Sequence, residues 1–92
     1  MRRSDTRERR AIAVIALRTR AYGRAKSAVR RELAEAADRA LREACEEERR
    51  IYRAEFVDGM DSKRASASCF MSVATYYRMR RKLLERVADE VG

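Results

Sequence analysis

Apolar residues recur at every third or fourth position along most of this chain, which is the spacing of an amphipathic helix. The clearest stripe lies in the last third, and its members are Tyr76, Met79, Leu83 and Val87. Ser72 precedes this stripe, and its hydroxyl can accept a hydrogen bond from an N–H group of the first helical turn. The pattern predicts a helix over residues 72–91 with one apolar face and one basic face.

A short segment rich in small residues, 62–69, comes before that helix. It predicts a second, shorter helix with Ala65 and Cys69 turned inward. A tight turn at Phe70 and Met71 separates the two. A short helix, a tight turn and a longer basic helix are typical of a helix-turn-helix motif.

The first half of the chain predicts two more helices. Residues 11–22 hold the most apolar run, and we interpret it as core rather than a dimer seam, because a small domain needs every apolar face it has. The segment 26–57 predicts one long central helix, with an apolar stripe from Val29 to Phe56. The acidic run at 46–48 interrupts this stripe, and we interpret it as a solvated face.

Composition favours an all-α fold. The chain has 92 residues, no proline and only three glycines, and no window alternates apolar with polar residues as a strand would. Its length allows one small domain. We divide this domain into a flexible basic arm (1–10), a helical hairpin that offers a possible oligomerisation segment (11–57) and the helix-turn-helix segment (58–92). Gly59 suits a left-handed turn at the start of the last segment.

Charge is distributed unevenly along the chain. The net charge is +8, with +9 over residues 1–31, −5 over 32–61 and +4 over 62–92. Two basic ends flank an acidic middle, which favours nucleic acid as the partner over an acidic membrane surface.

Several residue types are missing or sparse. There is no histidine, which removes the usual general base and the commonest metal ligand, and no glycine-rich phosphate loop. Cys45 and Cys69 match no metal-ligand spacing and are interpreted as reduced structural thiols. No apolar run reaches the length of a membrane span, and no signal peptide is evident. We therefore expect a soluble cytoplasmic protein that is not an enzyme and has no cofactor or metal.

In a helix-turn-helix, the N-terminal half of the second helix presents side chains to base edges in the major groove. The face opposite the apolar stripe supplies the base-contacting candidates Val73, Ala74, Tyr77, Arg78 and Arg81. Because the chain has no Asn or Gln, it can read guanine through arginine and thymine methyl groups through Val73 or Ala74. The phosphate-contacting candidates are Ser72, Thr75, Arg80, Lys82, Lys63 and Arg64.

The basic arm supplies a further set of candidates, namely Arg2, Arg3, Arg7, Arg9 and Arg10. Such an arm either enters an adjacent minor groove or only raises non-specific affinity. The residues favour neither alternative.

Three stretches share the pattern of a known family, namely residues 51–56, the helix start Met71-Ser72-x-x-Thr75-x-Tyr77-Arg78 and the tail 80–92. This part of the chain resembles the C-terminal part of the RinA/ArpU-type phage transcriptional regulators, and it is also similar to the region-four helix-turn-helix of bacterial sigma factors. The resemblance implies an activator of phage late-gene operons that helps to recruit host RNA polymerase. Phe70 departs from the family pattern, since glycine is common there and a positive φ is costly for phenylalanine. We expect a distorted turn or an aromatic plug.

Two other functions remain open on the residues alone. One is a DNA-packaging or replication accessory, similar to a small terminase, which would form a ring-like assembly through residues 11–22 and 26–57. A homodimer or higher oligomer is a possible state of the chain in general. The other is a helical protein–protein adaptor of the transcription machinery, whose basic helix docks on an acidic partner. DNA affinity that is unchanged by Arg78→Ala and Arg81→Ala would favour the adaptor.

Overall fold

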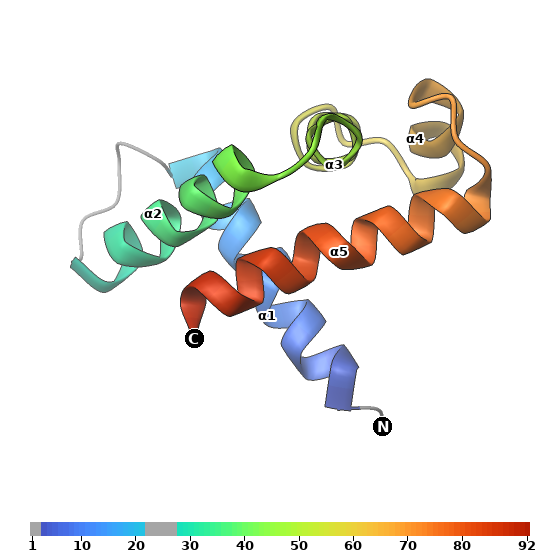
Figure 1. Ribbon diagram of the computed structural model, residues 1–92. Helices are drawn as coiled ribbons and strands as arrows, with labels where there is room; N and C mark the ends of the chain where they lie inside the picture. Colours follow the sequence, from blue (N-terminus) through green and yellow to red (C-terminus); the bar gives the residue numbers. More distant parts are fainter. Residues whose placement is uncertain (1–2, 22–27) are drawn as a thin grey trace.

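The computed structural model describes residues 3–21 and 28–92, and every regular element within these residues is helical (Figure 1). The elements are, in chain order, α1 (Arg3–Ala21), α2 (Ala28–Glu43), α3 (Glu46–Ile51), the π-helix η1 (Tyr52–Val57), α4 (Ser62–Ser68) and α5 (Val73–Val91). The predicted all-α class is confirmed.

The C-terminal helix α5 is the element against which the others pack. Helices α1, α2, α3 and α4 all contact it, and α1 crosses it in Figure 1. The inward side chains Tyr76, Leu83 and Val87 have no exposed surface, and Met79 packs at the edge of the same core. Burying an aliphatic side chain of this size contributes about 1.5–3 kcal/mol. The apolar stripe predicted for the last helix is therefore confirmed.

The apolar run of α1 also lies in this core. Ala11, Val14 and Ile15 are buried against the alanine-rich face of α2 and the inner face of α5. The interpretation of this run as core is confirmed. The stripe predicted for the next helix begins too early, however, because Val29 is exposed in the first turn of α2.

The long central helix predicted over 26–57 is wrong. α2 ends at Glu43, and Cys45 adopts an extended backbone that starts the new helix α3. The guanidinium of Arg49 donates to the carbonyl oxygens of Leu41 and Arg42 at 3.1 and 2.8 Å, so a side chain replaces the backbone donors that a continuous helix would have supplied. The break directs α3 against α5.

Three glutamates fill the first turn of α3. Carboxylates are favourable at the positive end of a helix dipole, so the acidic run that seemed to interrupt one helix marks the beginning of another. The chain then widens into η1, which ends where the N–H of Asp58 donates to the carbonyl of Arg53 at 2.9 Å. Gly59 follows with a φ of +71°, which confirms its predicted left-handed conformation.

Residues 1–10 were predicted to form a flexible arm, but the part of this segment that the structure describes is helical. Residues 3–10 form the first turns of α1. Two ion pairs tie these turns to α5, one between Arg7 and Asp89 and one between Glu8 and Arg80, whose N···O distance is 2.9 Å. Arg2 and the side chain of Arg3, both predicted to belong to the arm, lie outside the described part of the chain.

Candidate nucleic-acid interface

At the α4–α5 junction, which comprises the two helices and the turn between them, each helix begins at a side-chain cap. Asp61 caps α4, because its Oδ1 accepts a hydrogen bond from the N–H of Arg64 at 2.8 Å. Ser72 caps α5, because its Oγ accepts from the N–H of Thr75 at 3.2 Å. Each such cap is worth about 1 kcal/mol. The predicted N-cap role of Ser72 and the predicted short helix before it are confirmed.

Backbone hydrogen bonds close the turn between the end of α4 and the start of α5. The N–H of Phe70 donates to the carbonyl of Ala67 at 3.1 Å, and the N–H of Met71 donates to the carbonyl of Ser66 at 3.0 Å. These bonds satisfy carbonyls that the end of α4 would otherwise leave unpaired. Ala65 and Cys69 are buried as predicted, so the turn holds α4 closely against the core.

Phe70 was predicted either to distort the turn or to pack as an aromatic plug, and it does neither. It has a φ of +57°, the conformation that a glycine would adopt at no steric cost, and the turn around it is regular. Phe70 is 93% exposed, so its ring does not pack against the core as an aromatic plug. The backbone bonds impose the left-handed conformation, and the ring points into solvent because Cys69 already fills the inward position.

The face of α5 that points away from the core carries all of the predicted base-contacting residues. Val73, Ala74, Tyr77, Arg78 and Arg81 are exposed. Tyr77 is also engaged within the chain, because its hydroxyl lies 2.8 Å from the hydroxyl of Ser62 at the start of α4. This bond leaves about half of the Tyr77 surface accessible and fixes the two helices relative to each other.

The predicted phosphate-contacting residues divide into two groups. Ser72, Lys82, Lys63 and Arg64 are exposed beside this face, and Thr75 is half-buried. The exception is Arg80, whose side chain is only 17% exposed and is bound by carboxylates. The assignment of Arg80 to phosphates is therefore wrong, since its donors point inward.

Arg80 lies at the centre of an internal ion cluster that joins three elements. Its Nε donates to Glu55 Oε1 at 2.9 Å, and its Nη1 donates to Glu8 Oε1 at 2.9 Å. Burial alone would lower the pKa of Arg80, but the hydrogen bonds to Glu55 and the negative charges of Glu55 and Glu8 together raise it above its ordinary value. The guanidinium therefore stays charged and holds α1, η1 and α5 together.

Tyr76 completes this cluster by donating its hydroxyl proton to Glu55. Burial, followed by that hydrogen bond, raises the pKa of Tyr76 above its ordinary value of 10.0. The folded state thus favours the neutral phenol, and the associated stability is complete below pH 10 and is lost as pH rises through the folded-state pKa.

We expect Tyr76→Phe to reduce the free energy of unfolding by about 1–2 kcal/mol at pH 8, because a hydrogen bond to a carboxylate is lost. Above pH 10, the wild-type protein should lose stability more steeply than the variant. The difference between their free energies of unfolding should therefore become smaller. Urea unfolding of both proteins at pH 8 and pH 11 measures this difference. A gap that stays constant or widens with pH would contradict the raised pKa.

A second internal ion pair was missed by the sequence interpretation. Glu48 belongs to the acidic run taken as a solvated face, yet it is 1% exposed. Its carboxylate accepts from Arg86 Nε of α5 at 2.8 Å and from Cys45 Sγ at 3.3 Å. Only the break before α3, which rotates Glu48 toward α5, makes this pairing possible. The outer neighbour Glu46 is exposed and pairs with Arg50 at 3.7 Å, as the spacing indicates.

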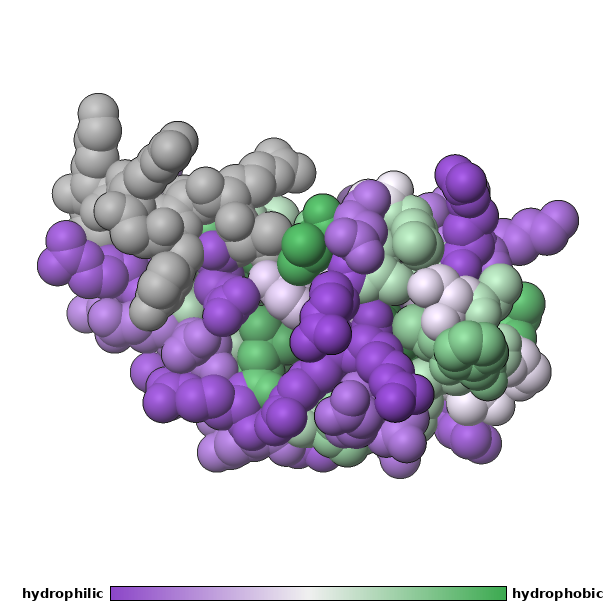
Figure 2. All heavy atoms as spheres, turned by 90° about the horizontal axis from the view of Figure 1, so that it is seen from above, coloured by the Kyte–Doolittle hydropathy of each residue, from purple (hydrophilic) through white to green (hydrophobic). Residues whose placement is uncertain are grey.

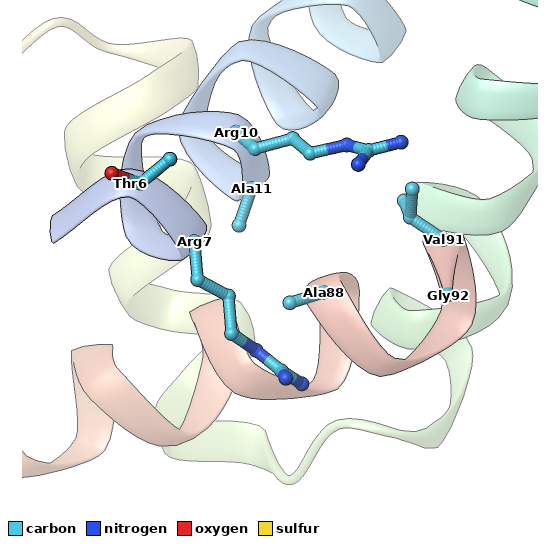
Figure 3. A pocket seen from close by; sticks show the side chains of 7 residues that line it. All are labelled: Thr6, Arg7, Arg10, Ala11, Ala88, Val91 and Gly92. Carbon is cyan, nitrogen blue, oxygen red and sulfur yellow. The ribbon is translucent and has the colours of Figure 1, made fainter. Parts of the chain in front are cut away.

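The arginines predicted for the arm lie along the start of α1. Arg7, Arg9 and Arg10 are exposed, and Arg7 and Arg10 line a pocket of about 280 Å³ between α1 and the end of α5. Figure 3 shows both side chains extending from α1 toward the last turns of α5. The opposite wall includes Ala88 and Val91, so the pocket is largely apolar. Contact of these arginines with DNA stays a prediction.

The two cysteines are free in the structure, and burial raises the pKa of both thiols. Within residues 3–21 and 28–92, no group of three or more metal-ligating side chains is placed to hold a metal ion. None of the helices that the structure describes is long and apolar enough to cross a membrane.

Comparison of the chain with known proteins returned no matching family model, no matching curated protein and no matching solved structure.

Proposed function

We propose that this protein binds double-stranded DNA through a helix-turn-helix formed by α4, the four-residue turn and α5. The observation that carries the proposal is the outer face of α5, where Arg78, Arg81 and Lys82 are exposed in its N-terminal half. No acidic residue lies between Ser62 and Leu84, so every charged residue in this stretch is basic. A polyanion is the partner that such a surface fits.

The charge of α5 changes along its length, which defines the part of it that reads DNA. Its second half carries Glu85, Asp89 and Glu90, and these would repel phosphates. The N-terminal half, capped by Ser72, offers unpaired N–H groups as well as cations. The helix therefore enters the major groove by its N-terminal half, with Arg78 and Arg81 directed at guanine and Lys82 at phosphate.

Transcriptional regulation is the process that we assign to this binding. The support is the resemblance of residues 51–92 to RinA/ArpU-type phage regulators, which also suggests host RNA polymerase as a second partner. A phage or prophage origin and action in the bacterial cytoplasm belong to the same proposal. Two copies on paired half-sites would be the expected arrangement if the selected DNA site is symmetric.

Arg78→Ala is expected to weaken binding at a selected DNA site by about 1–3 kcal/mol and to relax base preference at one position. Lys82→Ala should instead weaken binding to all sequences similarly and reduce the slope of log K against log salt by about 1. Titration of fluorescent duplexes at several salt concentrations measures both quantities. The duplex comes from selection on a random library at near-physiological salt.

The matched control is Arg31→Ala, which removes the same charge from an exposed site on α2. Figure 1 shows that the first turns of α2 and of α5 lie at opposite ends of the molecule. Arg31→Ala should leave affinity and base preference nearly unchanged. If all three variants behave alike, or if the folded wild-type protein retains no duplex at all, the proposed function is wrong.

A further inference from the structure

Three of the large apolar side chains exposed in the described part of the chain lie close together in sequence at the α4–α5 junction. Phe70 is 93% exposed, Val73 53% and Tyr77 49%. In Figure 2, pale and green spheres gather at the right-hand end of the molecule, which is the end that α4 and the junction occupy in Figure 1. Elsewhere the visible face is mostly hydrophilic.

Phe70 contributes little to the fold that carries it. Its ring is almost wholly in water, and its φ of +57° is unfavourable for a side chain of this size. Glycine would satisfy the same turn without strain. Non-glycine residues held in this conformation by the surrounding structure cluster at functional sites.

The surroundings of Phe70 identify the chemistry of such a contact. Lys63 and Arg64 are exposed on α4, and Arg78 is exposed on α5. Because the stretch from Ser62 to Leu84 carries basic residues and no acidic residue, a polyanion that also presents apolar groups is the partner that fits it. Duplex DNA does so in the major groove, through the 5-methyl group of thymine, which phenylalanine and small aliphatic side chains contact.

We propose that Phe70, together with Val73, contacts thymine methyl groups at the edge of the DNA site that α5 reads. This inference rests on the proposed function and deepens it, since it assigns thymine to positions beside the guanines contacted by arginine. Phe70 thereby becomes a specificity-determining residue of the turn. The turn fixes the backbone of Phe70 before DNA binds, so less conformational freedom is lost on binding than from a flexible loop.

The test compares a selected duplex with the same duplex in which deoxyuridine replaces thymine, which removes only the methyl group. Wild-type affinity should fall by about fourfold for each contacted methyl. Phe70→Gly should bind the thymine duplex more weakly than the wild type and should discriminate less between the two duplexes. The same variant should unfold about 4–8 °C higher, because the left-handed strain is relieved.

Two further variants make the outcome decisive. Phe70→Asn tolerates the left-handed conformation without the flexibility of glycine, and it should lose the same discrimination. Val29→Ser removes an exposed apolar side chain from the first turn of α2 and should retain the full wild-type discrimination.

Equal sensitivity to deoxyuridine in the wild type and in both Phe70 variants would overturn the assignment, and so would a selected motif without thymine. DNA binding through α5 would still stand in either case. Phe70 variants that bind DNA like the wild type would place the ring on a protein partner instead. Failure of the folded wild type to bind any duplex would instead refute the proposed function itself.

Discussion

Glu55→Ala is expected to lower the free energy of unfolding by about 3–5 kcal/mol, the largest effect of any single substitution considered for this protein. Glu55 accepts hydrogen bonds from both Arg80 and Tyr76, and its side chain and that of Arg80 are each 17% exposed. Removing the carboxylate leaves a largely buried guanidinium that still pairs with Glu8. Urea unfolding at neutral pH measures the loss.

Glu46→Ala is the matched control, because it removes a carboxylate from an exposed pair with Arg50 on α3. It should cost less than about 1 kcal/mol, from the exposed ion pair and the helix dipole together. In a second comparison, Glu55→Leu combined with Arg80→Met should recover much of the loss, because an apolar pair replaces an uncompensated charge. If Glu55→Ala lowered the free energy of unfolding as little as Glu46→Ala, the cluster would have to be open to water. It could then not hold α5 against α1 and η1.

Arg86→Ala is expected to cost about 2–3 kcal/mol. The substitution leaves the Glu48 carboxylate, which is 1% exposed, with the weak Cys45 thiol as its remaining partner. We place the loss at or below the lower end of the range for a broken buried pair because Arg86 is 42% exposed and its removal admits water. Thermal or urea unfolding reports the change.

Arg81→Ala controls for removal of an arginine from the same helix, since Arg81 is exposed and should change stability by less than about 0.5 kcal/mol. Adding Glu48→Gln to Arg86→Ala should restore part of the loss, because a neutral amide is cheaper to bury than an unpaired carboxylate. If the Arg86→Ala protein were as stable as the Arg81→Ala protein, the ion pair between Arg86 and Glu48 would not stabilise the fold.

These two ion clusters explain how the proposed reading helix is held. Arg80 and Arg86 lie on α5, and they bind Glu55 of η1 and Glu48 of α3 respectively. Carboxylates of the chain bind both guanidinium groups, although Arg86 stays 42% exposed, so these two cations are less available to DNA than unpaired ones. The exposed cations Arg78, Arg81 and Lys82 are therefore selected by the packing of α5 from a basic run that looks uniform in the sequence.

The candidate site was largely predictable where it depends on local chemistry. The N-cap of Ser72, the short helix before the turn and the outward direction of Arg78 follow from spacing within one or two helical turns. The role of Arg80 was not predictable in this way, because its partners are 25 and 72 residues distant in the chain. Side chains on a helix flank can face either solvent or a neighbouring element, and periodicity alone does not distinguish them.

The sequence by itself determined the helical class, the position of the α4–α5 junction and the inward face of α5, since each depends on residues close together in the chain. Tertiary structure alone decided the break at Cys45, the burial of Glu48 and the loss of Arg80 from the surface. It also decided that Phe70 is left in water. The physical reason is that a charge or a ring is buried only when a distant element supplies its partner, and the chain meets that partner only on folding.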